Sequence, residues 1–422
     1  MQSRLIHSII KNSLFKKNIT LFCIIVCSSL TACVTTQLNQ ATLQNQIDTI
    51  TAASGTHAVR GIAIQSLQTG QIVYVKNFNL PFVPASNMKL FTAAAALIYL
   101  GPAYQYHTTI YRNNNDIYMK YTGDPDLTAQ QVKNLIRQLK QSGISRIKGN
   151  FYIDNSQYDN YDIAPGWMWD DLKYCYAAPV DAVMINHNCI VPLNSTIDDN
   201  DPAIQFPYHT ATTLIYQSLQ QNHIFLQGKI LSGTVDRQAK IIADQVSQPL
   251  SALVTQMLKN SDNLIANSLL KTLGSTYFKQ AGNWDNGVLA MQTILNQRYH
   301  INFSQAKIVD GSGLSRYDLI TPQQTLQLLN YVYHDQAIAI YFINALPIAG
   351  YDGTLKNRML SRNIMGRVHA KTGTMGGVSS LSGYAYTNNN QVYAFVIFMN
   401  NFVGKVKSQT NIEDEIVSIL VN

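Results

Sequence analysis

The alternation of apolar and polar residues predicts a β-hairpin early in the chain. The ranges 57–66 and 71–76 are β-like, and a Thr-Gly turn separates them. An apolar stretch rich in alanine and leucine follows at 91–100 and ends in Gly-Pro, which is a helix-stop signature. Because a proline-containing break precedes Ser86, we expect this residue near the N-terminus of the helix.

The middle of the chain has a different pattern. It contains short β-like runs at 104–111, 117–121 and 149–153, and one stretch at 128–142 with apolar residues at helical spacing. Gly-Asp-Pro and Pro-Gly-Trp sequences mark tight turns between them. We therefore predict an inserted α+β domain over residues 103–248.

Helical periodicity returns after the predicted insertion. Three neighbouring strands and a final amphipathic helix are then expected at 368–373, 380–387, 391–399 and 411–421. A domain made of 55–102 and 249–422, with the middle segment projecting from it, is a common arrangement for an insertion. The predicted fold class is α+β.

The first 32 residues predict a lipoprotein signal peptide. A lysine-rich start is followed by an apolar run that is too short to span a bilayer as a stable helix. Leu-Thr-Ala then precedes Cys33, so we expect this cysteine to be lipidated; the alternative is a plain signal peptide with a chance cysteine. Val34 after the cysteine favours a lipid-anchored periplasmic protein of the outer membrane in a Gram-negative cell. Residues 33–54 are expected to form a linker and the start of an N-terminal helix.

The net charge argues against nucleic acid as a partner. The 422 residues carry a formal charge of +7, but four positive residues precede Cys33, where no acidic residue occurs: Arg4, Lys11, Lys16 and Lys17. The remaining +3 is too small to indicate nucleic-acid binding. A hydrophobic content of 46% excludes global disorder, and the length predicts two or three domains.

Two of the five cysteines predict a disulfide. Cys23 and Cys27 belong to the signal and Cys33 to the anchor, which leaves Cys175 and Cys189. One remaining pair in an exported chain indicates a disulfide, although two free buried thiols are the alternative. No His-Glu-x-x-His, Cys-x-x-Cys or close histidine pair occurs, so no metal site is predicted.

Three short motifs occur in the order found in penicillin-recognising serine enzymes. They are Ser86-Asn87-Met88-Lys89, Ser261-Asp262-Asn263 and Lys371-Thr372-Gly373. Each is weak alone, because Ser-x-x-Lys recurs at five other places: Ser8, Ser13, Ser145, Ser268 and Ser304. Their context is stronger evidence, since the first is expected at a helix start, the second in or just after a helix, and the third on a strand.

The position of Ser86 gives the first motif a chemical meaning. Residues three apart on a helix share a face, so Lys89 can reach the Ser86 hydroxyl. Free N–H groups and partial positive charge at a helix N-terminus favour a neutral lysine that acts as a base, and they stabilise a developing oxyanion. These residues therefore indicate a serine nucleophile with a lysine base.

Longer sequence segments resemble one family closely. The chain resembles the class C, low-molecular-mass penicillin-binding proteins, which are D-alanyl-D-alanine carboxypeptidases and endopeptidases. The segments that carry the resemblance are 84–90, 123–125, 164–167, 178–179, 310–316, 346–355 and 369–374. The resemblance covers roughly residues 55 to 400. It implies a β-lactamase/transpeptidase-like domain, an antiparallel sheet flanked by helices, which carries the inserted domain.

The resemblance also implies roles for five catalytic residues. Ser86 would be the nucleophile, and Lys89 would accept its proton. Ser261 would relay a proton toward the leaving amine, and Asn263 would bind the backbone of the substrate. Lys371 would supply positive charge for the terminal carboxylate and for proton relay.

Further implied roles belong to the third motif. Thr372, Gly373 and Thr374 would bind substrate, and the N–H groups of Ser86 and Thr374 would form the oxyanion hole. Asp262 has no assigned role. For the segment 310–316, the glycines indicate turn chemistry first.

The chain departs from the family pattern in two respects. The interval from Ser86 to Ser261 is shorter than in large members, and the loss falls after Cys189, at about 191–206. This shortening puts access to cross-linked substrate in doubt. A lipid anchor is also unusual in a family whose members are often soluble in the periplasm.

The predicted function is a serine DD-peptidase of peptidoglycan stem peptides that β-lactams inhibit. One alternative is a β-lactamase, although no glutamate clearly marks a deacylation base. Another is a non-catalytic penicillin-binding scaffold lipoprotein, although an intact motif set argues against it. A Ser-His-Asp hydrolase is disfavoured because no Gly-x-Ser-x-Gly occurs, and His369 is better explained as a strand residue.

Overall fold

The computed structural model describes residues 40–52, 57–190 and 198–421. A helix over 40–52 belongs to one compact unit, and the chain from 57 onward forms a second. The predicted signal peptide and Cys33 lie outside the described residues, as does 191–197 within the predicted shortening. None of the helices in the described ranges is both long and apolar enough to cross a membrane.

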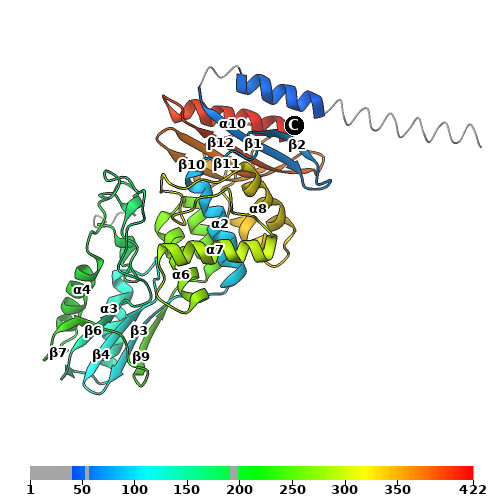
Figure 1. Cartoon of the computed structure of the whole chain (residues 1–422). Coiled ribbons are helices and arrows are strands. Elements are labelled where there is room, and N and C mark those ends of the chain that lie inside the picture. Colours follow the sequence, from blue (N-terminus) through cyan, green and yellow to red (C-terminus); the bar gives the residue numbers. More distant parts are fainter. Residues whose placement is uncertain (1–39, 53–56, 191–197, 422) are drawn as a thin grey trace, which may run out of the picture. The chain divides into compact units, whose positions relative to one another are not determined.

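The larger unit contains a five-stranded antiparallel sheet in the order β10-β11-β12-β1-β2 (Figure 1). Its strands are β1 (Val59–Ser66), β2 (Ile72–Lys76), β10 (Val368–Met375), β11 (Val378–Tyr386) and β12 (Val392–Asn400). The predicted hairpin and the three predicted neighbouring strands are confirmed. Pairing of β1 with β12 joins the two sequence ends of this unit in one sheet.

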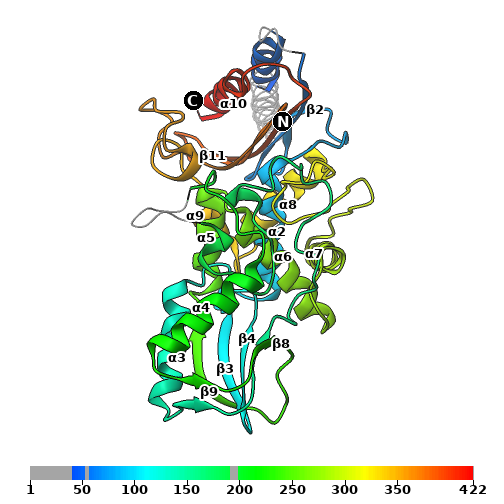
Figure 2. The same ribbon diagram turned by 90° about the vertical axis from the view of Figure 1, so that its left-hand side faces the viewer.

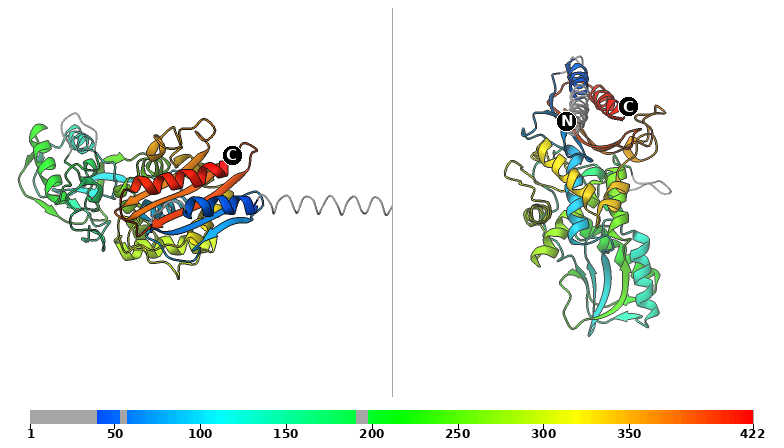
Figure 3. Two further views of the ribbon diagram at one scale, coloured as in Figure 1. Left: turned by 90° about the horizontal axis from the view of Figure 1, so that it is seen from above. Right: turned by 90° about the vertical axis from the view of Figure 1, so that its right-hand side faces the viewer.

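Helices cover both faces of this sheet, which explains why β11 is buried along almost its whole length. The C-terminal helix α10 (Val406–Val421) packs on β11, as the view from above shows (Figure 3). On the other face, α8 (Pro322–His334) packs on β1 and β12. The predicted final helix is confirmed, although it begins earlier than residue 411.

The helix that follows Ser86 lies in the middle of the main core. In α2 (Met88–Tyr99), all residues from Met88 to Leu97 are buried, as expected for a helix surrounded by others. The neighbouring helices are α5 (Leu250–Asn260), α6 (Asn263–Phe278), α7 (Trp284–Tyr299) and α9 (Ala339–Ala345). This helical layer fixes the position of α2, and therefore of the residues at its start.

A second sheet lies at the opposite end of the helical layer (Figure 2). Its order is β8-β6-β4-β3-β9, and α3 and α4 pack against each other beside it. The elements are β3 (His107–Asn113), β4 (Asp116–Tyr121), α3 (Ala129–Gln141), β6 (Phe151–Asp154), α4 (Pro207–Gln221), β8 (Ile230–Ser232) and β9 (Lys240–Val246), with a short pair β5 (Arg146–Ile147) and β7 (Phe225–Leu226). This sheet has its own apolar cluster, which includes Ile110, Met119, Leu135 and Phe151.

The segment between β6 and α4 does not belong wholly to this second sheet. Tyr158, Trp167 and Val180 are part of the main core instead. The buried Lys271 of α6 holds the segment, because its Nζ donates to Asp159 Oδ1 (3.0 Å) and to two backbone carbonyls. Much of the segment between β6 and α4 therefore packs onto the helical layer, whereas the sequence pattern had grouped it with the inserted domain.

A buried ion pair between Arg358 and Glu413 of α10 gives a stability prediction. Glu413 is fully buried, accepts from Ser379 Oγ (2.6 Å) and pairs with Arg358 Nη2 at 2.8 Å. Arg358→Met leaves this carboxylate without its cation, so we expect the free energy of unfolding to fall by about 3 kcal/mol. Denaturant unfolding measures the change. The control Arg362→Met, at an exposed position, is expected to unfold like wild type; equal stability of the two variants would contradict the role of the pair.

Candidate active site

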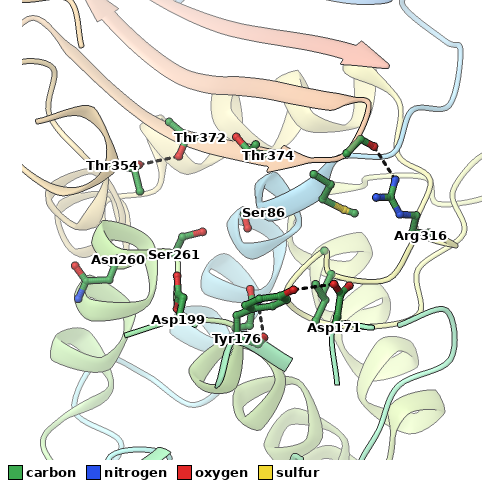
Figure 4. Close-up of a pocket in the computed structure, with 16 residues that line it drawn as sticks. Ser86, Asp171, Tyr176, Asp199, Asn260, Ser261, Arg316, Thr354, Thr372 and Thr374 are labelled. Atoms are coloured by element: carbon green, nitrogen blue, oxygen red, sulfur yellow. Dashed lines mark hydrogen bonds between the residues drawn. The ribbon is translucent and has the colours of Figure 1, made fainter. Parts of the chain in front are cut away.

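A pocket of about 430 Å³ opens where the start of α2, the turn between α5 and α6, and the edge strand β10 meet (Figure 4). Ser86 lies in its middle, with Ser261 on one side and Arg316 on the other. The pocket brings together residues from all three predicted motifs: Ser86, Ser261, Asn263, Thr372, Gly373 and Thr374. The two motif lysines lie just beneath its surface.

Ser86 is presented by a short 3-10 turn, Ala85–Asn87, directly before α2. Ala85 adopts a left-handed backbone conformation with φ 46°, which a residue with a side chain rarely does. Asn87 Nδ2 donates to Ser380 Oγ (2.6 Å), and Ser380 Oγ donates to the Pro84 carbonyl (2.8 Å). These bonds fasten the turn to β11, so the position of Ser86 is set by the sheet as well as by its helix.

Lys89 is fully buried beneath Ser86 and donates three hydrogen bonds. Its Nζ lies 2.9 Å from Ser86 Oγ, 2.6 Å from Asn263 Oδ1 and 2.8 Å from the Ser312 carbonyl. All three acceptors are neutral. Burial lowers the pKa of Lys89 to about 8, although the more distant carboxylates of Asp310 and Asp262 oppose the shift. Lys89 can therefore accept a proton from Ser86 near neutral pH.

The second motif lies at a sharp reversal between two helices. Ser261 follows the last residue of α5 in a left-handed conformation (φ 64°), and Asp262 is the N-cap of α6, accepting from the Ile265 N–H at 2.9 Å. Asn263, the first residue of α6, donates through Nδ2 to the Tyr176 carbonyl (2.8 Å). The reversal lets Ser261 and Asn263 both face the pocket, although they are two residues apart.

Lys371 on β10 is the second buried amine of the site. Its Nζ donates to Ser261 Oγ (2.8 Å) and to the Thr372 carbonyl (2.9 Å). Burial, and then the charge of Lys89, lower the pKa of Lys371 well below its usual range. Within the described part of the chain, neither Lys89 nor Lys371 forms a salt bridge with a carboxylate. The charge of Lys89 therefore favours the loss of a proton from Lys371.

Gly373 allows β10 to approach the nucleophile. A Cβ atom at this position would lie 3.0 Å from the Ser86 nitrogen and 2.9 Å from the Pro84 carbonyl oxygen, so a side chain would push the strand away. Thr372 Oγ1 donates to Thr354 Oγ1 (2.7 Å), and Thr374 is exposed to the pocket. The strand thus presents polar groups on the opening beside Ser86.

The segment 310–316 supports Lys89 from below. The carboxylate of the buried Asp310 accepts the N–H groups of Ser312, Gly313 and Ser315 and the indole N–H of Trp167, at 2.6 to 2.9 Å. These bonds fix the position of the Ser312 carbonyl, which accepts a hydrogen bond from Lys89. Gly313 has φ +79° and lies against the Ala85 carbonyl, as turn chemistry predicts, whereas Gly311 does not have a positive φ.

Six pocket residues with polar side chains were not singled out from the sequence as site residues. They are Asp171, Tyr176, Asp199, Asn260, Arg316 and Thr354. Tyr176 Oη donates to Asp171 Oδ1 (2.7 Å), and Arg316 donates to the Gly376 carbonyl (2.8 Å). Three of them lie within or close to segments that carried the family resemblance: Arg316 in 310–316, Thr354 in 346–355, and Tyr176 two residues before 178–179. Asn260 directly precedes the Ser261 motif, whereas Asp171 and Asp199 lie outside these segments and had no such signal.

Cys175 and Cys189 are joined by a disulfide, with Cα atoms 5.4 Å apart. The bond links two short 3-10 turns, Cys175–Ala177 and Asn186–Asn188, and lies in a small buried cluster with Ala178 and Ala203. Tyr176 is therefore anchored beside the pocket. Among the described residues, no group of three or more potential ligands could hold a metal ion.

A serine directly before a helix, a buried lysine one helical turn away, a Ser-x-Asn reversal and a Lys-Thr-Gly edge strand define a penicillin-recognising serine enzyme. The family model described as the D-Ala-D-Ala carboxypeptidase 3 (S13) family matches residues 43–202 and 191–422. The chain belongs to this family. It is a serine-type DD-peptidase of the penicillin-binding class.

Individual relatives agree with this assignment. The chain is 29% identical to the D-alanyl-D-alanine carboxypeptidase DacB of Haemophilus influenzae, over 83% of this chain and 87% of that protein. It is 28% identical to the D-alanyl-D-alanine carboxypeptidase of an Actinomadura species, over 82% and 78%. The crystal structure of penicillin binding protein 4 from H. influenzae superposes with a TM-score of 0.81 at 27% identity, covering 89% and 99% of the two chains, and a second structure of it contains a β-lactam.

The pKa of Lys89 gives a prediction for the pH dependence of acylation. Only the neutral amine can take the Ser86 proton, and the neutral fraction rises as pH increases through about 8. We expect the rate constant of acylation by benzylpenicillin to rise about tenfold per pH unit below this value and to level off above it. Stopped-flow measurement of acylation across the pH range gives this rising part of the pH–rate profile, called the pH limb below. A midpoint near 10, close to the ordinary value of a lysine, would contradict the lowered pKa of Lys89.

Proposed function

We propose that this DD-peptidase cleaves D-Ala-D-Ala termini, D-Ala cross-links, or both, in peptidoglycan through an acyl-enzyme on Ser86. The observation that carries the proposal is the contact between Lys89 Nζ and Ser86 Oγ at 2.9 Å, made by a buried amine whose other acceptors are neutral. A lysine in this environment can act as a base near neutral pH.

In the proposed acylation step, Lys89 takes the Ser86 proton while Oγ attacks the carbonyl carbon of the penultimate D-Ala. The N–H groups of Ser86 and Thr374 would stabilise the oxyanion. The carbon–nitrogen bond then breaks, and Ser261 passes its hydroxyl proton to the leaving amine while it takes a proton from Lys371; Lys89 keeps the Ser86 proton. The contact between Ser261 Oγ and Lys371 Nζ (2.8 Å) supports this route. Water then attacks the ester, with the proton transfers reversed, and frees Ser86.

Substrate orientation is proposed for residues on both walls of the pocket. The negative charge of the terminal carboxylate would raise the lowered pKa of Lys371 on binding, so that Lys371 could supply positive charge for it. Thr372, Gly373 and Thr374 on β10 would bind the substrate along the strand. Asn263 would bind the substrate backbone from the opposite wall. Its side chain is already held between the Lys89 amine and the Tyr176 carbonyl, which favours a single orientation.

Two leaving groups are compatible with the proposed chemistry. A leaving D-Ala corresponds to carboxypeptidase activity, and a leaving diaminopimelate corresponds to endopeptidase activity, by the same chemistry. The H. influenzae and Actinomadura relatives are named carboxypeptidases, which favours the first reaction for this chain. β-Lactams are proposed to acylate Ser86 and to remain attached.

Intact-mass analysis with benzylpenicillin tests the nucleophile. A protein that starts after Cys33 should gain one drug mass and keep it, whereas Ser86→Ala should gain none, because the attacking oxygen is absent. Release of D-Ala or cleavage of cross-links in purified muropeptides then distinguishes the two peptidase reactions. Hydrolysis of the drug without a lasting adduct would indicate a β-lactamase, and a stable adduct without peptide turnover would indicate a penicillin-binding scaffold.

We also propose that Cys33 is lipidated and anchors the protein in the periplasm, at the outer membrane in a Gram-negative cell. The Leu-Thr-Ala-Cys sequence after a short apolar run supports this proposal. Growth with a labelled fatty acid should mark the wild type and not Cys33→Ala, and fractionation should place only the wild type with membranes. Cys27→Ala is the matched control and should remain labelled. An unlabelled wild-type protein would contradict the anchor.

A further inference from the structure

A left-handed turn beside the active site holds one histidine in a fixed direction. The consecutive residues Asn186, His187 and Asn188 have φ values of 52°, 57° and 50°. Asparagine tolerates this backbone, but a histidine is strained by it, so the surroundings must hold His187 in place. Asn186 Oδ1 accepts the Ala129 N–H (2.9 Å), and Asn188 Nδ2 donates to the Pro179 carbonyl (2.9 Å). Strain maintained in this way often marks a functional position.

The side chain of His187 lies between two carboxylates. Its Nε2 is 3.2 Å from Asp126 Oδ1 and its Nδ1 is 3.4 Å from Asp262 Oδ2, while only 12% of the side chain is exposed. Both ring nitrogens can face carboxylates as donors only in the imidazolium form. Burial lowers the pKa of His187, but the two carboxylates outweigh it and raise the value to about 10. Asp124 is a further carboxyl group close enough to His187 for their charges to interact.

One of these carboxylates belongs to the catalytic reversal. The Asp262 side chain caps α6 through Oδ1 and faces His187 through Oδ2. Asp262 lies between Ser261 and Asn263 in the sequence. Ser261 Oγ accepts a hydrogen bond from Lys371, and Asn263 Oδ1 accepts one from Lys89. A displacement of the Asp262 carboxylate would therefore move the partners of both buried amines.

We propose that His187 is a positioning residue of the reaction, whose imidazolium holds Asp262 and thereby the Ser261–Asn263 reversal in the geometry that serves the two lysines. This proposal rests on the proposed function. His187 itself does not line the pocket, so it acts through Asp262 and touches no substrate. Its neighbour Asp126 holds the far side of the ring, which ties the loop before α3 to the catalytic reversal.

The imidazolium also affects the charge of the base. The carboxylate of Asp262 favours the protonated form of Lys89, and the positive charge of His187 offsets that carboxylate. Removal of the His187 charge therefore stabilises protonated Lys89. The acylation limb should move to higher pH, because less of the lysine is neutral at a given pH.

His187→Asn is the sharpest test, because asparagine tolerates the left-handed backbone but carries no charge. His223→Asn is the matched control, since His223 has φ 53° and is exposed. We expect acylation by benzylpenicillin to slow roughly tenfold or more at neutral pH in His187→Asn, with the pH limb raised by about one unit. The dissociation constant of the non-covalent complex should stay the same, and the control should match wild type.

A folded His187→Asn variant with the wild-type rate and pH limb would overturn the proposal, and so would a fall in melting temperature without these kinetic changes. Should this variant fail to fold, Asp126→Asn removes the other hydrogen-bond partner of the same ring and should slow acylation by a smaller factor, with the dissociation constant of the non-covalent complex unchanged. A wild-type acylation rate in this variant would again overturn the proposal. The wild-type adduct on Ser86 tests the proposed function separately, so the two proposals fail in different ways.

Discussion

Two lysine side chains are buried without a carboxylate partner among the described residues, and the site depends on this constraint. A buried amine prefers to lose its proton, and a second amine nearby adds to that preference. In the part of the chain that the structure describes, Lys89 and Lys371 donate only to neutral acceptors: hydroxyl, amide and carbonyl oxygens. A carboxylate in contact with either lysine would restore its usual pKa and remove the base. The enzyme instead keeps Asp310 and Asp262 one layer away, where they orient the backbone around the amines.

The fold supplies this environment by joining distant parts of the chain. The sheet brings β10 alongside the start of α2, and Gly373 permits the close approach. The helical layer brings the reversal at Ser261 to the same place, and Asp310 fixes the carbonyl that receives Lys89. Each motif is therefore positioned by residues that lie outside it in the sequence. The same logic makes the left-handed turn at His187 a part of the site, since it fixes Asp262 from a segment that the sequence assigns to the insertion.

Local patterns in the sequence were sufficient for the elements and for the motif residues. Thr128, for example, caps α3 as a residue with a short polar side chain at a helix start is expected to do. Periodicity identifies which face of an element is buried, but not which distant segment covers it. The bond from Asn263 to the Tyr176 carbonyl spans 87 residues, and the left-handed conformation of Ser261 depends on its surroundings rather than on residue type. For the same reason, much of the segment between β6 and α4 was assigned to the insertion although it packs on the helical layer.

Direct titration of the Lys89 side chain tests the central claim. Heteronuclear NMR of protein with isotope-labelled lysines, assigned by the signal that disappears in Lys89→Arg, reports the charge of this amine without reliance on catalysis. The account predicts a midpoint near pH 8, because burial among neutral acceptors destabilises the cation. A midpoint near the ordinary lysine value of about 10.4 would contradict it.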